Sequence, residues 1–169
     1  MAGHELAQLN IGRILAPLDT PTMAGFTGAL DEINALADGS PGFVWRLQTE
    51  DGDATAIRAF DDDMLLLNMS VWTSLEPLAE FVYRSDHRAV MVQRRKWFER
   101  LDEAITVLWW VPAGHRPSTH EAKERLEHLR EHGPTPTAFT FRDSFPAPDA
   151  DPGTSTATST DPDLWNCPA

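Results

Sequence analysis

The segment from Met64 to Trp72 carries the strongest strand pattern in the sequence and constrains the fold more than any other feature. Leu65, Leu67, Met69 and Val71 alternate there with Leu66, Asn68, Ser70 and Trp72. Successive side chains of a β-strand point to opposite faces, so one face of this strand is wholly apolar and the other carries an amide and a hydroxyl. We therefore expect a strand in the core of a sheet, with polar groups on one of its faces.

Other segments follow the strand or helix periodicity and are bounded by turn residues. Further strands are expected at residues 4–14, 43–47, 105–111 and 138–142, and the acidic stretch 50–63 is expected to be a loop. Pro21 after Thr20, Ser74 and Ser85 are typical helix starts, and Ser118 with Glu121 forms a capping-box pattern. Helices are expected from these points to about residues 38, 83, 100 and 132.

This order of elements predicts an α+β fold, with helices on one face of a mainly antiparallel sheet. The segment 105–111 is apolar on both of its faces. A sheet with helices on one side only would leave one of these faces uncovered. A second copy of the chain would cover it, so we expect a homodimer.

Composition limits the class of protein. The chain has 169 residues, 41% of them hydrophobic, which is enough for one domain with a core. We place this domain at residues 1–146, followed at 147–169 by a disordered acidic tail rich in Pro, Thr and Asp. A single cysteine and no signal-peptide pattern make a cytoplasmic protein the expectation.

Charge and hydropathy exclude several partners. The net charge is −12, and four aspartates of the tail leave −8 on the body. This acidity argues against binding to nucleic acid or to anionic lipid, since both need Lys and Arg. No apolar run approaches the roughly 20 residues of a membrane-spanning helix. Composition therefore removes several classes of partner and names no function.

The first candidate site lies on the strand 64–72. Asn68, Ser70 and Trp72 share one face, and Asn10 would join them if the first strand is its neighbour. An unpaired buried polar group costs about 1 to 3 kcal/mol, so these groups need partners. They form either an internal hydrogen-bonded network or the lining of a ligand site.

The second candidate site lies on the stretch after Ser85. His87, Arg94 and Trp97 fall on its apolar stripe at helical spacing. The first turn of a helix disfavours a charged imidazole, so a neutral His87 would be a general base, a haem ligand or a packed core histidine. Arg94 would orient an acidic substrate or form a salt bridge.

No motif predicts a metal, a nucleotide or a serine or cysteine hydrolase. His128 and His132 have chelating spacing on a charged helix, but the sequence shows no third ligand near them. G-x-S-x-G and G-x-G-x-x-G are absent from the sequence, and Cys167 lies in the tail. We expect no bound metal.

Five segments of the chain together resemble a bacterial family, the domain of unknown function 3291. They are HELAQLNI (4–11), SPGFVWRL (40–47), NMSVW (68–72), FVYRSDH (81–87) and LWWVPAGHRP (108–117). The likeness extends from residue 4 to about residue 146. This family is similar to the dimeric α+β barrel superfamily, whose ferredoxin-like units face each other through their sheets. The resemblance thus implies a ferredoxin-like fold and a dimeric α+β barrel.

The superfamily includes the antibiotic-biosynthesis monooxygenases, which oxidise phenolic polycyclic substrates with O₂ and without a cofactor. Their pockets use an asparagine and a tryptophan four residues apart, with an asparagine from the first strand, and Asn68, Trp72 and Asn10 match these placements. The resemblance implies that the amide and indole N–H groups stabilise a substrate enolate. Other members bind haem through a helical histidine, a role that His87 could take.

The leading prediction is a small-molecule enzyme, a monooxygenase-like oxidoreductase without a cofactor, acting on an aromatic or polyketide-type substrate between sheet and helices. The alternatives are a haem protein and a non-catalytic ligand-binding or scaffold dimer. The predicted catalytic residues are His87, Asn68 and Trp72, and the predicted substrate-binding residues are Asn10, Ser70, Arg94 and Trp97.

Overall fold

The computed structural model describes residues 3–49, 60–84, 89 and 92–150. Its strands are β1 (His4–Arg13), β2 (Phe43–Arg46), β3 (Leu65–Trp72) and β4 (Thr106–Pro112). Its helices are α1 (Ala24–Asp38), α2 (Leu75–Arg84) and α4 (Thr119–His132), with 3₁₀ turns η1 (Pro21–Met23) and η2 (Arg94–Lys96). Within these ranges no helix is long and apolar enough to cross a bilayer.

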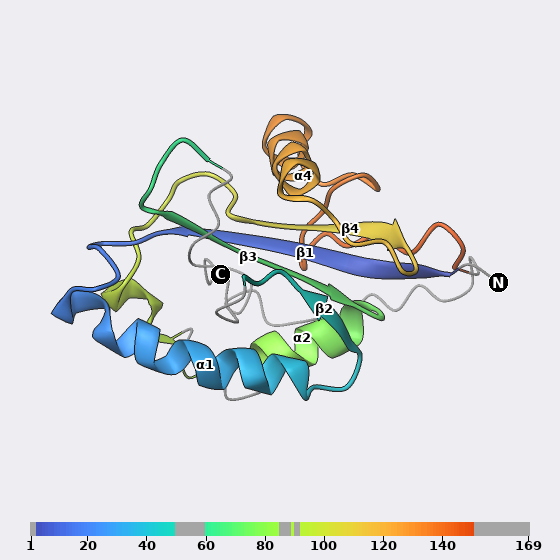
Figure 1. The fold of residues 1–169 in the computed structure, drawn as a ribbon. Helices are drawn as coiled ribbons and strands as arrows, with labels where there is room; N and C mark the ends of the chain where they lie inside the picture. The colour runs from blue at the N-terminus through green and yellow to red at the C-terminus, as the bar shows by residue number, and fades with distance from the viewer. Residues whose placement is uncertain (1–2, 50–59, 85–88, 90–91, 151–169) are drawn as a thin grey trace.

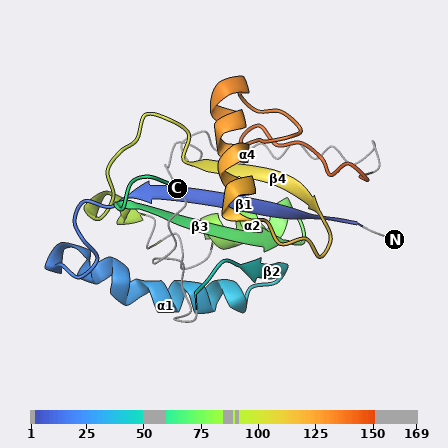
Figure 2. The same ribbon diagram turned by 45° about the horizontal axis from the view of Figure 1, so that its top comes forward.

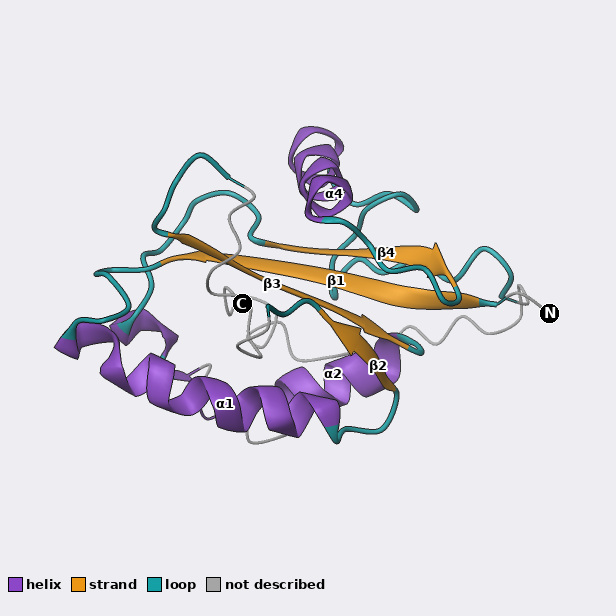
Figure 3. Cartoon of the chain, viewed as in Figure 1, coloured by secondary structure: helices purple, strands orange, loops and turns teal. Residues whose placement is uncertain are grey.

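The four strands form one antiparallel sheet in the order β2-β3-β1-β4 (Figure 3). β1 and β3 lie in the middle because they are the long strands with apolar residues to bury. The succession β1-α1-β2-β3-α2-β4 in this strand order is the ferredoxin-like arrangement. The predicted α+β class and ferredoxin-like sheet are confirmed.

The sequence predicts all helices on one face of the sheet, but the structure has helices on both faces. α1 and α2 cover one face, while α4 lies on the other (Figures 1 and 2). Leu126 and Leu129 of α4 join the same buried cluster as Val107 and Trp109 of β4. The chain therefore covers part of the second face by itself, since α4 packs against the apolar side chains that β4 presents there. The homodimer stays a prediction.

The predicted start of α4 at Ser118 is confirmed, whereas the structure differs from the prediction at residues 138–142 and near residue 100. Ser118 caps α4, its Oγ accepting from the N–H of Glu121 at 3.1 Å. The expected strand at 138–142 is reduced to two isolated bridges, one between Phe139 and Leu108 and one between Ala138 and Thr135. The helix expected to reach residue 100 is replaced near its end by η2 and a bridge from Phe98 to Ile14, while residues 85–88, 90 and 91 lie outside the described part.

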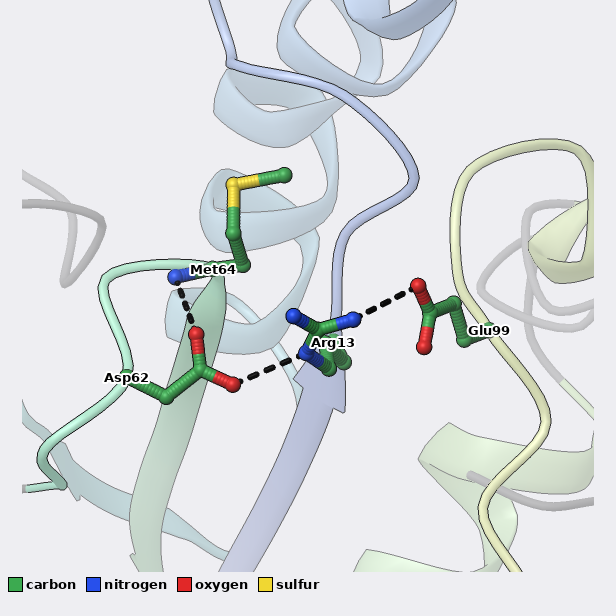
Figure 4. Close-up of polar contacts among 4 residues, drawn as sticks. All are labelled: Arg13, Asp62, Met64 and Glu99. Atoms are coloured by element: carbon green, nitrogen blue, oxygen red, sulfur yellow. Dashed lines mark hydrogen bonds and ion pairs between the residues drawn. The ribbon is translucent and has the colours of Figure 1, made fainter.

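Arg13, the last residue of β1, ties together three segments (Figure 4). Its Nε donates to Asp62 Oδ2 at 2.8 Å and its Nη1 to Glu99 Oε1 at 2.7 Å. Asp62 Oδ1 also accepts from the N–H of Met64 at 2.9 Å. The hydrogen bond from Arg13, the hydrogen bond from the N–H of Met64 and the charge of Arg13 lower the pKa of Asp62, and the two carboxylates raise the pKa of Arg13.

We expect Asp62→Asn to lower stability slightly at neutral pH and to have no effect in strong acid. The asparagine keeps an acceptor for Met64 but loses the charge that pairs with Arg13. A carboxyl whose pKa is lowered by folding stabilises the fold above its unfolded pKa of about 3.9, and this contribution disappears as the pH falls through the lower folded pKa. Thermal denaturation of both proteins from about pH 7 to about pH 2 measures the difference, which should shrink to zero within this range.

The control is Asp31→Asn, because Asp31 is exposed on α1. That variant should match the wild type at every pH. A wild-type advantage over Asp62→Asn that stays constant down to about pH 2 would show that the ion pair is not its source.

Candidate functional site

The face of the sheet that meets α1 and α2 carries two adjacent rows of polar side chains. In one row Asn10 of β1 lies opposite both Asn68 of β3 and Thr106 of β4. In the next row Gln8 lies opposite Ser70, and Ser70 lies opposite a residue of β2. We call these residues the polar band: Gln8, Asn10, Arg46, Asn68, Ser70 and Thr106.

Arg46 joins the band because the register of β2 shifts. Residues two apart in a strand normally share a face. Phe43, however, packs with the cluster under α1 and α2, while Trp45 packs with the cluster on the opposite face. The shift lies between these two residues, and beyond it Arg46 pairs with Ser70. Such irregularities commonly re-aim a side chain next to a functional site.

The polar band forms the floor of a cavity of about 70 Å³ between the sheet and the two helices. This space would hold about five water molecules. Its other walls are mainly apolar and come from α1, from α2, from the end of β3 and from the C-terminal segment: Ile33, Asn34, Ala37, Trp72, Leu78, Phe81, Val82 and Phe141. Aromatic walls around a few polar groups are typical of small-molecule sites.

Ser70 is the centre of a buried hydrogen-bond network. Only 6% of its surface is exposed, and 8% of that of Gln8. Its Oγ accepts from Trp72 Nε1 at 2.9 Å and from Gln8 Nε2 at 3.3 Å. The Trp72 ring, 1% exposed, stacks on Phe81. The indole N–H therefore already has an acceptor within the protein.

The amides of the other row differ in their partners. Asn10 Nδ2 donates to Thr106 Oγ1 at 2.9 Å. Asn68 lines the cavity and is exposed, so it lies where the cavity meets solvent. Among the residues that the structure describes, no hydrogen bond of the Asn68 or Asn34 side chain is found. These two amides can therefore hydrogen-bond to a ligand without breaking an internal contact.

Arg46 supplies the positive charge of the cavity. Its side chain is 12% exposed and binds Asp38 at the end of α1 through two bonds, from Nε at 2.8 Å and from Nη2 at 3.2 Å. Paired donors of this kind fix the plane of the guanidinium group. The guanidinium thus has a defined position beside Ser70.

The described lining offers hydrogen bonds but no carboxylate, imidazole or thiol for acid–base chemistry. Amides, hydroxyls and one guanidinium make up its polar part, with no Asp, Glu, His or Cys among the lining residues of the described chain. Nor does any group of three or more such side chains in the described ranges have a geometry for a metal ion. The cavity can bind and polarise an oxygen-bearing molecule through these donors.

The structure brings together four of the seven predicted site residues: Asn10, Asn68, Ser70 and Trp72 all line the cavity. Arg94 and Trp97 lie apart from it. Arg94 Nη2 donates to the carbonyl of Ile11 at 3.0 Å, and Trp97 is buried in a separate apolar cluster. His87 lies outside the described residues.

Sequence reasoning missed three members of the polar band: Gln8, Arg46 and Thr106. Gln8 shares a strand face with Asn10, and that alternation was a usable signal. Thr106 faces Asn10 only through the pairing of β1 with β4, which the sequence does not state. Arg46 depends on the register shift of β2, for which the sequence holds no signal.

Comparison with solved structures finds proteins of similar fold. Two solved structures are similar to it: SnoaB from Streptomyces nogalater, described as a cofactor-independent oxygenase, and NE2512 from Nitrosomonas europaea, described as a protein of unknown function. SnoaB has 15% identity and a TM-score of 0.44, over 66% of this chain and 95% of its own. NE2512 has 12% identity and a TM-score of 0.42, over 68% of this chain and 96% of its own.

No curated protein matches the sequence. One family model does match, and it covers residues 5–155, which include the sheet except His4, the helices around it and every residue of the polar band. The protein therefore belongs to the family described as a domain of unknown function, DUF3291.

Proposed function

We propose that this protein is a small-molecule enzyme that binds an oxygen-bearing aromatic substrate in the cavity under α1 and α2 and oxidises it with O₂, without a bound cofactor. The observation that carries the proposal is the composition of the cavity, in which the polar band faces aromatic walls. The reaction class comes from the resemblance of Asn10, Asn68 and Trp72 to the antibiotic-biosynthesis monooxygenases.

In this proposal the two asparagines act on the substrate oxygen. Asn68 lies at the entrance, and Asn10 lies opposite it on β1. Amide N–H groups directed at a carbonyl or phenol oxygen stabilise the negative charge that forms when the substrate becomes an enolate. The electron-rich enolate then reacts with O₂. The N–H of Trp72 is already donated to Ser70, so we do not assign it to the substrate oxygen. Trp72 instead forms the wall on which the substrate ring lies.

The overall change can be written for anthrone, a three-ring member of the substrate class. Anthrone and O₂ give anthraquinone and water, so the CH₂ carbon loses two hydrogens and gains one oxygen atom. The substrate must first lose a proton. We propose that His87, the predicted base, accepts this proton from the substrate.

A binding protein without catalysis is the second candidate. It is favoured by one observation, that no carboxylate, imidazole or thiol is found among the described residues lining the cavity. Such a protein would hold the same class of ligand through the same amides, and release it unchanged.

The test combines oxygen uptake with binding. Full-length protein is mixed with a panel of hydroxy- and oxo-aromatic compounds of one to three rings, and an oxygen electrode follows O₂ consumption against a blank without protein. We expect Asn68→Ala to lower the rate with the best compound by about 100-fold or more, the usual cost of losing one donor to a developing oxyanion. His87→Ala should lower it by about 100-fold if His87 is the base.

The control is Asn166→Ala, which changes an asparagine far from the polar band in sequence and should keep full activity. Binding without O₂ uptake above the blank would establish the second candidate. A Soret band in freshly purified protein that His87→Ala removes would contradict the cofactor-free reaction and support haem. The absence of both binding and O₂ uptake across the panel would refute both candidates.

A further inference from the structure

Ser70 is a buried hydroxyl with both of its lone pairs in use. A serine hydroxyl has two lone pairs and one O–H donor. Trp72 Nε1 and Gln8 Nε2 both donate to Ser70 Oγ, at 2.9 and 3.3 Å. The indole nitrogen and the amide nitrogen are donors only, so neither can accept the Ser70 proton.

The remaining direction around Ser70 Oγ belongs to the O–H bond. Within the described part of the chain, no hydrogen bond donated by this hydroxyl is found. The side chain is nonetheless 94% buried and lines the cavity. A buried donor without an acceptor is costly, so an acceptor in the cavity is the partner that satisfies it.

The surroundings of Ser70 add donors on the same side. Arg46 lies opposite it on β2, and its guanidinium is a donor that cannot accept. Asn68, two residues away on β3, has an amide with no partner among the described residues. A ligand oxygen that carries no proton of its own can accept from Asn68 as well as from Ser70.

We propose that Ser70 is a specificity-determining residue, which donates its hydroxyl proton to a ketone or ionised phenol oxygen of the ligand. This inference rests on the proposed function of the cavity, and it names the ligand class more narrowly. The Gln8–Ser70–Trp72 network fixes the direction of the donor, because both N–H groups hold the lone pairs in place. Ser70 selects the ligand by the acceptor that the ligand presents.

The experiment compares α-tetralone with tetralin, two fused-ring molecules that differ by one carbonyl oxygen. Both are titrated into ¹⁵N-labelled full-length protein, and the indole N–H signal of Trp72 and the side-chain amide signal of Gln8 report binding. We expect the wild type to bind the ketone more tightly. In Ser70→Ala the ratio of the two dissociation constants should fall by about fivefold, the usual share of one neutral hydrogen bond.

Ser70→Thr keeps the hydroxyl and should restore the ratio. Ser144→Ala, an exposed serine outside the cavity, should leave it unchanged. If Ser70→Ala does not fold, the wild type still gives an answer. A ketone that accepts from Ser70 strengthens the bond from Trp72, so only α-tetralone should move the indole proton downfield.

The experiment distinguishes failure of the role proposed for Ser70 from failure of the function proposed for the cavity. If both compounds shift the cavity signals and Ser70→Ala leaves their ratio unchanged, Ser70 does not select the ligand, although the cavity remains a binding site. The same conclusion follows if tetralin moves the Trp72 proton as far downfield as α-tetralone does. If neither compound shifts the signals of Trp72 or Gln8, the cavity is not the site for this class of molecule, and both proposals are overturned.

Discussion

Trp72→Ala is expected to lower the free energy of unfolding by about 3 to 5 kcal/mol, the usual cost of removing a large aromatic side chain from a core. The indole is 1% exposed. It stacks on Phe81 of α2 with ring centroids 5.2 Å apart and meets the edge of Phe43 on β2 at 5.4 Å. One side chain thus connects the sheet, a helix and the edge strand, and its removal leaves a space that its neighbours cannot close.

Urea denaturation followed by far-UV circular dichroism measures this loss without relying on the fluorescence of the residue removed. Trp72→Phe is the matched variant, because it keeps a ring for Phe81 and loses the N–H to Ser70. It should cost less, about 1 to 2 kcal/mol, and leave Ser70 with one internal donor. Val92→Ala, at a position 71% exposed, should be neutral. A Trp72→Ala protein within about 1 kcal/mol of the wild type would show that the ring is not part of the core.

The sequence predicted the faces of the long strands because side-chain alternation is a local property. Leu67, Met69 and Val71 lie in one core cluster and Trp72 in another, as their alternation requires. The location of α4 was a different matter. Its apolar residues show that one of its faces is buried, but they do not state against which side of the sheet. Both faces of β4 were apolar, so either side was compatible with the pattern.

The candidate site was predictable where its residues lie on one strand, and not where they depend on the course of the chain between elements. Asn68, Ser70 and Trp72 were found on one face because a single strand carries them, and Asn10 was added on the assumption that β1 is the neighbour of β3. Arg94 and Trp97 were included because a continued helix would have carried them along the stripe of His87. The chain forms η2 at Arg94–Lys96 instead, and Arg94 donates to the backbone of β1. Helical periodicity has no predictive value beyond the point where a helix ends.

Gly42→Ala is the second large effect we expect, because the position requires glycine for two separate reasons. Gly42 has a φ of 81°, in the left-handed region that side chains disfavour. An added Cβ would also lie 2.5 Å from Pro77 Cβ and 2.8 Å from Thr73 Oγ1. Gly42 is further fixed by the bond from the N–H of Thr73 to its carbonyl, at 2.8 Å. The turn into β2 is thus packed directly against the start of α2.

The expected loss of stability is about 3 kcal/mol, the sum of a left-handed backbone cost near 1 kcal/mol and an overpacking cost near 2 kcal/mol. Gly114→Ala separates these two causes, since Gly114 has a φ of 88° and no atom within 4 Å of an added Cβ. It should lose about 1 kcal/mol only. Urea denaturation of the two variants gives the difference between them, and equal losses would show that the contact with Pro77 relaxes at no cost.

The same variant links the turn to the candidate site. The register shift of β2 lies between Phe43 and Trp45, directly after Gly42, and it places Arg46 opposite Ser70. A displaced turn moves the start of the strand that holds Arg46 in the cavity. Gly42→Ala should therefore weaken α-tetralone binding by more than Gly114→Ala does, at a temperature where both remain folded. Unchanged binding together with lost stability would mean that the turn at Gly42 does not fix the position of Arg46, whose guanidinium is also held by its paired bonds to Asp38.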